Sequence, residues 1–157
     1  MLKGTFILGL FWLVCTGLLS ACGSAVQYDQ PPEMRYGEDV CDQCNMIISE
    51  ARYAAAYYTQ SGEVRRFDGV GELSRYLLKH QEETASIWVH DYETEAWLAA
   101  EQAYYVIGPE LQTPMGDGAV ALGERERANA LAAQVGGEVM DFAGVMEHFK
   151  NAPAGMH

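Results

Sequence analysis

Short apolar runs that end at turn residues alternate with polar stretches along most of the chain. Three of these runs predict strands in the first half, at 52–59, 63–67 and 85–91. Between the second and third strands, apolar residues recur at helical spacing, and Asp68 precedes them as a suitable N-cap; they are Val70, Leu73, Leu77 and Leu78. The first half therefore predicts the order strand, strand, helix, strand.

The same order recurs in the second half of the chain. A short strand or strand end at 96–98 comes first, and further runs predict strands at 103–107, 119–122 and 138–140. A helix is expected at 124–135, with Gly136-Gly137 as its C-cap, and Asp141 can cap a last short helix. Two strand–strand–helix–strand (ββαβ) modules, at about 40–92 and 93–150, predict an α+β fold with mainly antiparallel pairing. Residues 151–157 are expected to be frayed.

The first 21 residues have the pattern of a secretory signal peptide. Lys3 supplies a positive start, and the apolar stretch 5–14 is too short and wrongly flanked for a membrane-spanning helix. The stretch ends in Leu19-Ser20-Ala21-Cys22, which resembles the bacterial lipobox. That resemblance implies a lipidated Cys22 as the first residue of the mature protein, anchored by its acyl chains on the periplasmic side of a membrane, with the outer membrane favoured. Residues 22–39, polar and carrying Pro31-Pro32, are expected to be a flexible tether.

The charge balance excludes some partners. The chain has a formal net charge of −12, and removal of the signal peptide takes away only Lys3. Nucleic acid requires a basic footprint, so we expect no nucleic-acid partner. A polybasic membrane-binding face is excluded for the same reason. The acidic surface is typical of a soluble domain, although it could also attract cations.

The chemistry concentrates in Cys41-Asp-Gln-Cys44-Asn-Met46. Cys15 leaves with the signal peptide and Cys22 carries lipid, so these two thiols remain. If residues 46–48 begin a strand, alternation places Cys44 and Met46 on one face. Thiolate and thioether are soft ligands that select Cu(I), and structural zinc sites do not use methionine. We therefore expect Cys44 and Met46 to bind Cu(I), with Cys41 as a less certain third ligand.

Other uses of the cysteine pair remain open. A structural Cys41–Cys44 disulfide is permitted outside the cytoplasm, but it would close a very small loop and stabilise the fold little. A thiol–disulfide redox protein is the main alternative function, although the strand–CxxC–helix context of thioredoxin-like motifs is missing. A structural zinc site would need a second ligand pair at suitable spacing.

Two further residues are candidate metal ligands. Met115, between Pro114 and Gly116, is expected in a turn that could display its thioether, with core packing as the alternative. His90 ends a strand and precedes Asp91, whose carboxylate could orient a ligating ring. No nucleophile elbow, phosphate-binding loop, dinucleotide fingerprint or HExxH motif occurs in the sequence. We therefore expect a protein that is not an enzyme.

Several separated motifs together resemble the NosL family of lipoprotein copper chaperones. The resemblance runs from about Val40 to Phe149, and five stretches carry it: Cys41-x-x-Cys44-x-Met46-x-Ile48, Arg66-Phe-Asp-Gly-Val70, Trp88-Val-His-Asp-Tyr92, Ala103-Tyr-Tyr-Val-Ile-Gly108 and Thr113-Pro-Met-Gly116. It implies paired ββαβ modules and Cu(I) bound through the positions of Cys44 and Met46. It also implies delivery to apo nitrous oxide reductase for its catalytic copper–sulfide centre, with an ABC-type maturation complex as membrane partner.

The chain departs from the family pattern at two places. Family members often carry glycine between the second cysteine and the methionine, where this chain has Asn45. Many continue the Pro-Met-Gly motif with histidine and glutamate, where this chain has Asp117-Gly118. A role for that histidine does not carry over, which leaves the remaining ligands open. A site bridged between two chains, and hence a homodimer, also stays open.

Overall fold

The structure is a computed structural model that describes residues 26–152. The expected signal peptide, the lipidated Cys22 and the tail from residue 153 lie outside the described residues. Among the residues described, none of the helices is long and apolar enough to cross a membrane.

The first sheet has four antiparallel strands in the order β2-β1-β3-β4. Strand β1 (Ala55–Thr59) forms a hairpin with β2 (Val64–Phe67), and on its other side it pairs with β3 (Thr84–His90). Helix α1 (Val70–His80) connects β2 to β3. The short strand expected at 96–98 is β4 (Trp97–Ala99), and it pairs with β3 in this first sheet. Two 3-10 turns, Ala51–Tyr53 and Ala100–Gln102, flank these strands.

The second sheet repeats the arrangement with three antiparallel strands in the order β6-β5-β7. The central strand β5 (Tyr104–Ile107) pairs with β6 (Ala119–Leu122) and with β7 (Glu138–Met140). Helix α2 (Arg125–Val135) ends at Gly136, whose φ of 63° fits the expected glycine C-cap. Helix α3 (Phe142–Asn151) begins at Asp141, whose carboxylate accepts a hydrogen bond from the Gly144 amide, as expected. The predicted α+β class with mainly antiparallel sheets is therefore confirmed.

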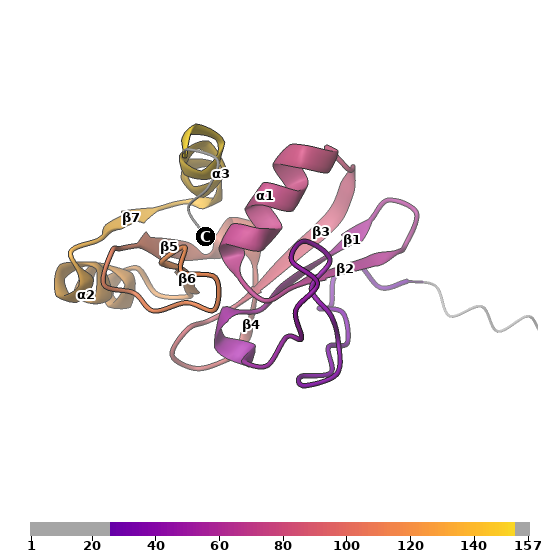
Figure 1. The fold of residues 1–157 in the computed structure, drawn as a ribbon, viewed down its shortest axis with the longest axis horizontal. Helices are drawn as coiled ribbons and strands as arrows, with labels where there is room; N and C mark the ends of the chain where they lie inside the picture. The colour runs from indigo at the N-terminus through magenta and orange to yellow at the C-terminus, as the bar shows by residue number, and fades with distance from the viewer. Residues whose placement is uncertain (1–25, 153–157) are drawn as a thin grey trace, which may run out of the picture.

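One core joins the two sheets with helices α1 and α3. Tyr57 and Phe67 of the first sheet and Tyr105 of the second belong to a single buried cluster that also includes residues of α1 and α3. Helix α1 packs against α3, whereas α2 covers the second sheet (Figure 1). The thiol of Cys41 is fully buried in the same cluster, so the cysteine loop is anchored in the core of the domain.

Asp91 connects the two sheets. It is 6% exposed, and it forms an isolated bridge with Ala121 of β6. Its carboxylate accepts hydrogen bonds from the amides of Glu93, Thr94 and Gly123, at 2.9, 2.8 and 2.7 Å. Burial acts to raise the pKa of Asp91, but these amides outweigh it and hold the pKa below its ordinary value.

Replacing Asp91 by alanine is expected to cost about 3 kcal/mol of unfolding free energy, because three backbone amides lose their hydrogen bonds to a buried carboxylate. The folded-state pKa is depressed, so the stabilisation is present above the ordinary aspartate pKa and is lost as the pH falls through the folded value. Denaturant unfolding at neutral and acid pH measures both effects. The difference in unfolding free energy between wild type and Asp91→Ala should shrink in acid. Asp141→Ala, which removes only an exposed helix cap, should cost about 1 kcal/mol. Equal losses in the two variants would contradict the role of Asp91.

Part of the expected tether is packed on the domain. Pro32 is fully buried, Gly37 donates its amide to the Ile48 carbonyl at 2.8 Å, and Arg66 donates to the Glu33 carbonyl. The Tyr28 ring lies edge-on against Tyr58 at 5.6 Å. From Val26 onward, the chain therefore follows the first sheet rather than hanging free of it.

Candidate metal centre

The cysteine loop is a tight hairpin. Val40 and Ile47 form an isolated antiparallel bridge, and the Cys41 amide donates to the Met46 carbonyl at 2.8 Å. Within the loop, the Asn45 amide donates to the Cys41 carbonyl at 2.9 Å. Residues 46–48 do not begin a strand, because Ile47 makes only this isolated bridge. Alternation along a strand therefore does not relate Cys44 to Met46; the turn between them does.

Asn45 occupies the left-handed region with a φ of 61°. Glycine is the ordinary residue for this conformation, and asparagine is among the few others that adopt it readily. The departure from the family pattern at this position therefore keeps the tight turn that pairs the Met46 carbonyl with the Cys41 amide.

Asn45→Gly is therefore expected to leave the loop and its metal affinity nearly unchanged. Asn45→Val should strain the loop by roughly 1–2 kcal/mol, since a branched side chain is disfavoured at positive φ. Thermal unfolding and metal titration of the two variants test this. A valine variant indistinguishable from wild type in both measurements would show that the turn is not required.

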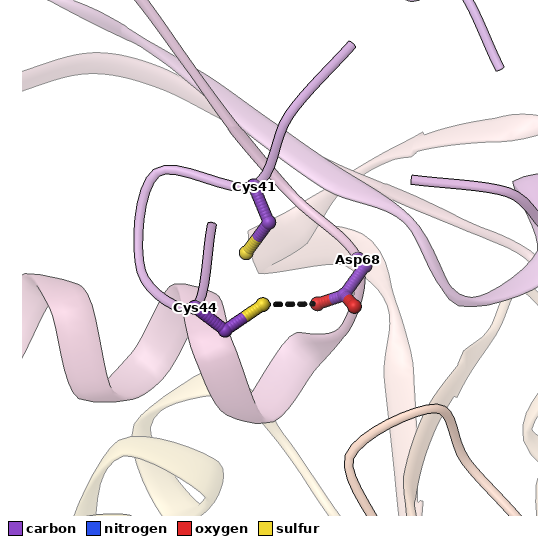
Figure 2. A group of neighbouring side chains, drawn as sticks. All are labelled: Cys41, Cys44 and Asp68. Carbon is purple, nitrogen blue, oxygen red and sulfur yellow. Dashed lines mark hydrogen bonds between the residues drawn. The ribbon is translucent and has the colours of Figure 1, made fainter. Parts of the chain in front are cut away.

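Three donor groups converge inside the loop. The sulfurs of Cys41 and Cys44 and a carboxylate oxygen of Asp68 all lie within 4.8 Å of one another. The Cys44 thiol points at Asp68 and donates to its Oδ1 at 3.6 Å, while the Cys41 sulfur lies beside this pair (Figure 2). Cys41 is buried, Cys44 is half-buried and Asp68 is 4% exposed, so the centre opens to solvent on the side of Cys44.

Asp68 is the residue that sequence reasoning assigned to another role. It was expected to cap α1, but the N-cap residue is Gly69, which has no side chain to cap the helix. Asp68 faces the thiols instead. It arrives there because the loop is attached to the end of β2: the Asp42 amide donates to the Arg66 carbonyl, and the Arg66 amide donates to the Asp42 carboxylate. No local signal marks this contact, which depends on the pairing of segments 24 residues apart.

The two thiols have different surroundings. Burial raises the pKa of the Cys41 thiol to about 12, although backbone amides of Cys44 and Asp68 act in the opposite direction. Cys41 is therefore protonated at neutral pH when no metal is bound. A soft metal ion that binds this sulfur must displace its proton, so metal binding here is coupled to proton release.

The outer edge of the loop is apolar and exposed. Met46 is 51% exposed, and the bridged pair Val40 and Ile47 are 49% and 55% exposed. A thioether in this position is accessible to solvent and to an approaching protein. The structure therefore places Met46 at the open edge of the loop that contains the thiols.

The other two candidate ligands have different environments. His90 is buried, its Nδ1 donates to the Glu95 carbonyl at 2.8 Å, and its Nε2 accepts from the Tyr36 hydroxyl. Both ring nitrogens are engaged, and the orienting partner is Glu95 rather than the expected Asp91. Met115 is half-buried in the turn closed by the bond from the Gly116 amide to the Thr113 carbonyl, at 3.0 Å. The part played by Met115 at the metal centre remains a prediction.

The fold and the site together define a class of protein: a small α+β domain of two ββαβ modules, with a buried and a half-buried thiol in one loop whose outer edge is exposed. Within this class, the sequence profile of the NosL family matches residues 34–149. The chain therefore belongs to the NosL family, and the resemblance noted in its motifs is confirmed.

Individual relatives agree with this assignment. The copper-binding lipoprotein NosL of Stutzerimonas stutzeri is 28% identical over 164 residues, covering 88% of this chain and 86% of the relative. The crystal structure of the copper chaperone NosL from Shewanella denitrificans matches with a TM-score of 0.63 and 23% identity, over 72% of this chain and 96% of that one, and supports the fold. Neither protein is named as an enzyme, in agreement with the expectation for this chain. ATP synthase subunit 4 of Neurospora crassa is 30% identical, but over only 54% of this chain and 36% of its own length.

Proposed function

We propose that the protein is a copper chaperone that binds one Cu(I) ion through the sulfurs of Cys41 and Cys44, with Met46 as the third ligand. The observation that carries the proposal is the convergence of two unbridged cysteines in a loop whose next ligating side chain is an exposed methionine. The copper-binding names of the relatives support the same metal. Copper is the cargo of the site, and no reaction is catalysed.

The donor set favours Cu(I) over other ions. Thiolate and thioether are soft ligands, and low-coordinate sulfur sites suit a monovalent soft ion. Two cysteines and a carboxylate would also satisfy zinc, which accepts Cys and Asp ligands but needs a fourth donor for its tetrahedral geometry. In the proposed Cu(I) site, Asp68 does not ligate. In the metal-free protein it accepts a hydrogen bond from the Cys44 thiol and positions that sulfur, and this bond is lost when Cu(I) displaces the thiol proton.

The accessibility of the site suits transfer. Cys41 and Asp68 are held in the core, whereas Met46 lies at the exposed edge and Cys44 is half-buried. An incoming ligand from an acceptor protein can therefore displace Met46 first and reach the metal while both cysteines still hold it. Release then proceeds by exchange of one ligand at a time, and the free ion is never exposed to water.

The family resemblance suggests the acceptor and the compartment. We propose delivery to apo nitrous oxide reductase for the assembly of its catalytic copper–sulfide centre, with an ABC-type complex as the membrane partner. The lipobox at Cys22 and the lipoprotein name of the S. stutzeri relative support anchoring on the periplasmic side of a membrane. Transfer of ⁶⁵Cu from the loaded protein to apo-reductase, followed by mass spectrometry, tests the acceptor, and retention of the isotope would contradict it.

Met46→Leu is expected to weaken Cu(I) binding by roughly 10–100-fold while leaving the fold intact, because leucine keeps the apolar volume and removes the sulfur. The matched control is Ile47→Leu, the adjacent residue of similar exposure, which should leave the affinity unchanged. An anaerobic competition titration against a coloured Cu(I) chelator measures both. Equal affinities in wild type and Met46→Leu would remove Met46 from the site.

A redox role is the second candidate function, because the Cys41 and Cys44 sulfurs lie within 4.8 Å of each other and are not bridged. A reduction potential in the range of thiol oxidoreductases together with insulin-reducing activity would favour it. The burial of Cys41 and its raised pKa argue against Cys41 as the attacking thiol, because a protonated thiol is a poor nucleophile, so the half-buried Cys44 would have to attack.

A further inference from the structure

We infer that the tip of the β1–β2 hairpin faces the membrane and that the metal centre points away from it. The inference rests on the proposed lipidation of Cys22, and it concerns the orientation of the domain rather than its cargo. The surface assigned to the bilayer is formed by Val26, Tyr28 and the turn 60–63, and its occupant is the phospholipid headgroup region.

The described chain begins at this hairpin tip. A Cβ placed on Gly62 would lie 3.1 Å from Cγ2 of Val26 and 3.7 Å from the hydroxyl of Tyr28. Tyr28 also donates to the Gln60 carbonyl and packs against the ring of Tyr58 in β1. The first residues of the packed domain are therefore fastened to the turn and not to the loop that holds the cysteines.

The connection to the lipid is short. Four residue steps separate Cys22 from Val26 in the sequence. A fully extended chain spans at most 3.3–3.6 Å per residue, so Val26 lies within about 14 Å of the anchored cysteine. The lipid therefore restrains Val26 close to the bilayer.

The exposed side chains of the tip are suited to contact with lipid headgroups once the anchor holds the tip at the membrane. Val26 and Tyr28 are 42% and 36% exposed, and tyrosine is enriched where membrane and water meet. Nearby, Glu63 and Glu82 pair with Arg65, so the tip offers no basic patch that would bind anionic lipid without the anchor. The apolar pair at the tip is separate from the exposed residues Val40, Met46 and Ile47 beside the thiols.

The metal centre lies at the opposite end of the same hairpin. Val64 pairs with Tyr58 next to the turn, whereas Phe67 pairs with Ala55 at the far end, and Asp68 follows it directly. Figure 1 shows the hairpin extending away from the rest of the domain. Six residues from Gly62 to Asp68 at about 3.3 Å per residue place the carboxylate roughly 20 Å beyond the tip. A membrane-anchored chain therefore presents its thiols toward soluble acceptors.

The experiment uses the full lipidated chain in vesicles of phosphatidylethanolamine and phosphatidylglycerol that contain a nickel-chelating lipid. Cys41→Ala and Cys44→Ala leave a background without reactive thiols, into which Ser61→Cys or Ile47→Cys introduces one nitroxide label. Circular dichroism establishes that each variant is folded. We expect several-fold stronger nickel-induced relaxation of the label at residue 61, beside the membrane, than of the label at residue 47, beside the metal centre.

A flexible insertion provides the matched control. A Gly-Ser segment of about ten residues placed between Ser24 and Ala25 should lengthen the connection and reduce the difference between the two labels. Equal relaxation at both positions in the parent chain, or stronger relaxation at residue 47, would overturn the orientation. Mass spectrometry that finds no acyl chains on Cys22 would also overturn the proposed orientation, because it would remove the membrane anchor. Copper binding is measured separately on the wild-type chain, which keeps Cys41 and Cys44, and would be untouched by either result.

Discussion

Cys44→Ser is expected to lower the Cu(I) affinity by more than about 100-fold, since the loss of outer partners alone costs metal sites roughly 10–100-fold. Cys44 is the half-buried sulfur that lies between the buried Cys41 and the solvent. A serine hydroxyl occupies the same space but is a hard and weakly acidic donor that a soft ion does not select. The Asp68 carboxylate remains beside it, so the variant also distinguishes sulfur ligation from carboxylate ligation.

Competition with a coloured Cu(I) chelator under anaerobic conditions measures this effect, with thermal unfolding as the control for the fold. Asp68→Asn is the matched comparison: it keeps the volume and a hydrogen-bonding oxygen, and it should cost less than Cys44→Ser. If Asp68→Asn abolished binding while Cys44→Ser kept it, the site would be a carboxylate site and the sulfur assignment would fail.

Glu72→Gln is expected to remove most of the loss of stability that the wild-type protein suffers between about pH 5 and pH 8. Glu72 lies on α1, is 2% exposed and accepts a hydrogen bond from Arg75 at 2.8 Å. Its second oxygen and Oδ2 of Asp117 have no hydrogen-bond partner among the described residues, and Asp117 Oδ2 packs against the backbone of Gly71. Burial and the neighbouring Asp117 raise the pKa of Glu72 from about 4.5 to about 8.

The direction of the pH dependence of stability follows from proton binding at Glu72. The folded protein holds the Glu72 proton up to about pH 8, whereas the unfolded chain loses it near pH 4.5. The stabilisation is therefore complete below the unfolded value and is lost as the pH rises through the folded value. The glutamine amide keeps a donor facing Asp117 and does not titrate.

Urea unfolding from pH 5 to pH 9 tests this prediction. At pH 9 the variant should exceed wild type by at least about 1 kcal/mol, since one pKa unit corresponds to 1.36 kcal/mol. Glu147→Gln, on the exposed face of α3, should follow the wild-type curve. Parallel curves for wild type and Glu72→Gln would show that the buried pair carries no proton at neutral pH.

The order of the elements could be predicted because each depends on local signals. The periodicity of Val70, Leu73 and Leu77 identifies α1, and the glycine pair after Val135 and the aspartate before Phe142 mark a helix end and a helix start that the structure confirms. The sequence showed the internal repeat only through the order of its elements. In the structure, β1 lies between β2 and β3 in the same way that β5 lies between β6 and β7.

The contacts that complete the site could not be predicted in the same way. Asp68 has the sequence context of a helix cap, and only the docking of the cysteine loop on the end of β2 turns it toward the thiols. Asp91 next to His90 suggested an oriented metal ligand, but its oxygens are used by backbone amides from two separate turns. The polar composition of residues 26–39 suggested a tether, whereas Pro32 is buried and Tyr28 packs on β1. Each of these depends on pairing between distant segments.

The most direct test of the copper centre is X-ray absorption at the copper edge of the reduced protein loaded with one equivalent of Cu(I). We expect a first shell made of sulfur alone, with a weaker sulfur contribution in Met46→Leu and a further loss in Cys44→Ser. A shell dominated by oxygen or nitrogen, or one that neither substitution changes, would contradict the assignment of Cys41, Cys44 and Met46 as the copper ligands.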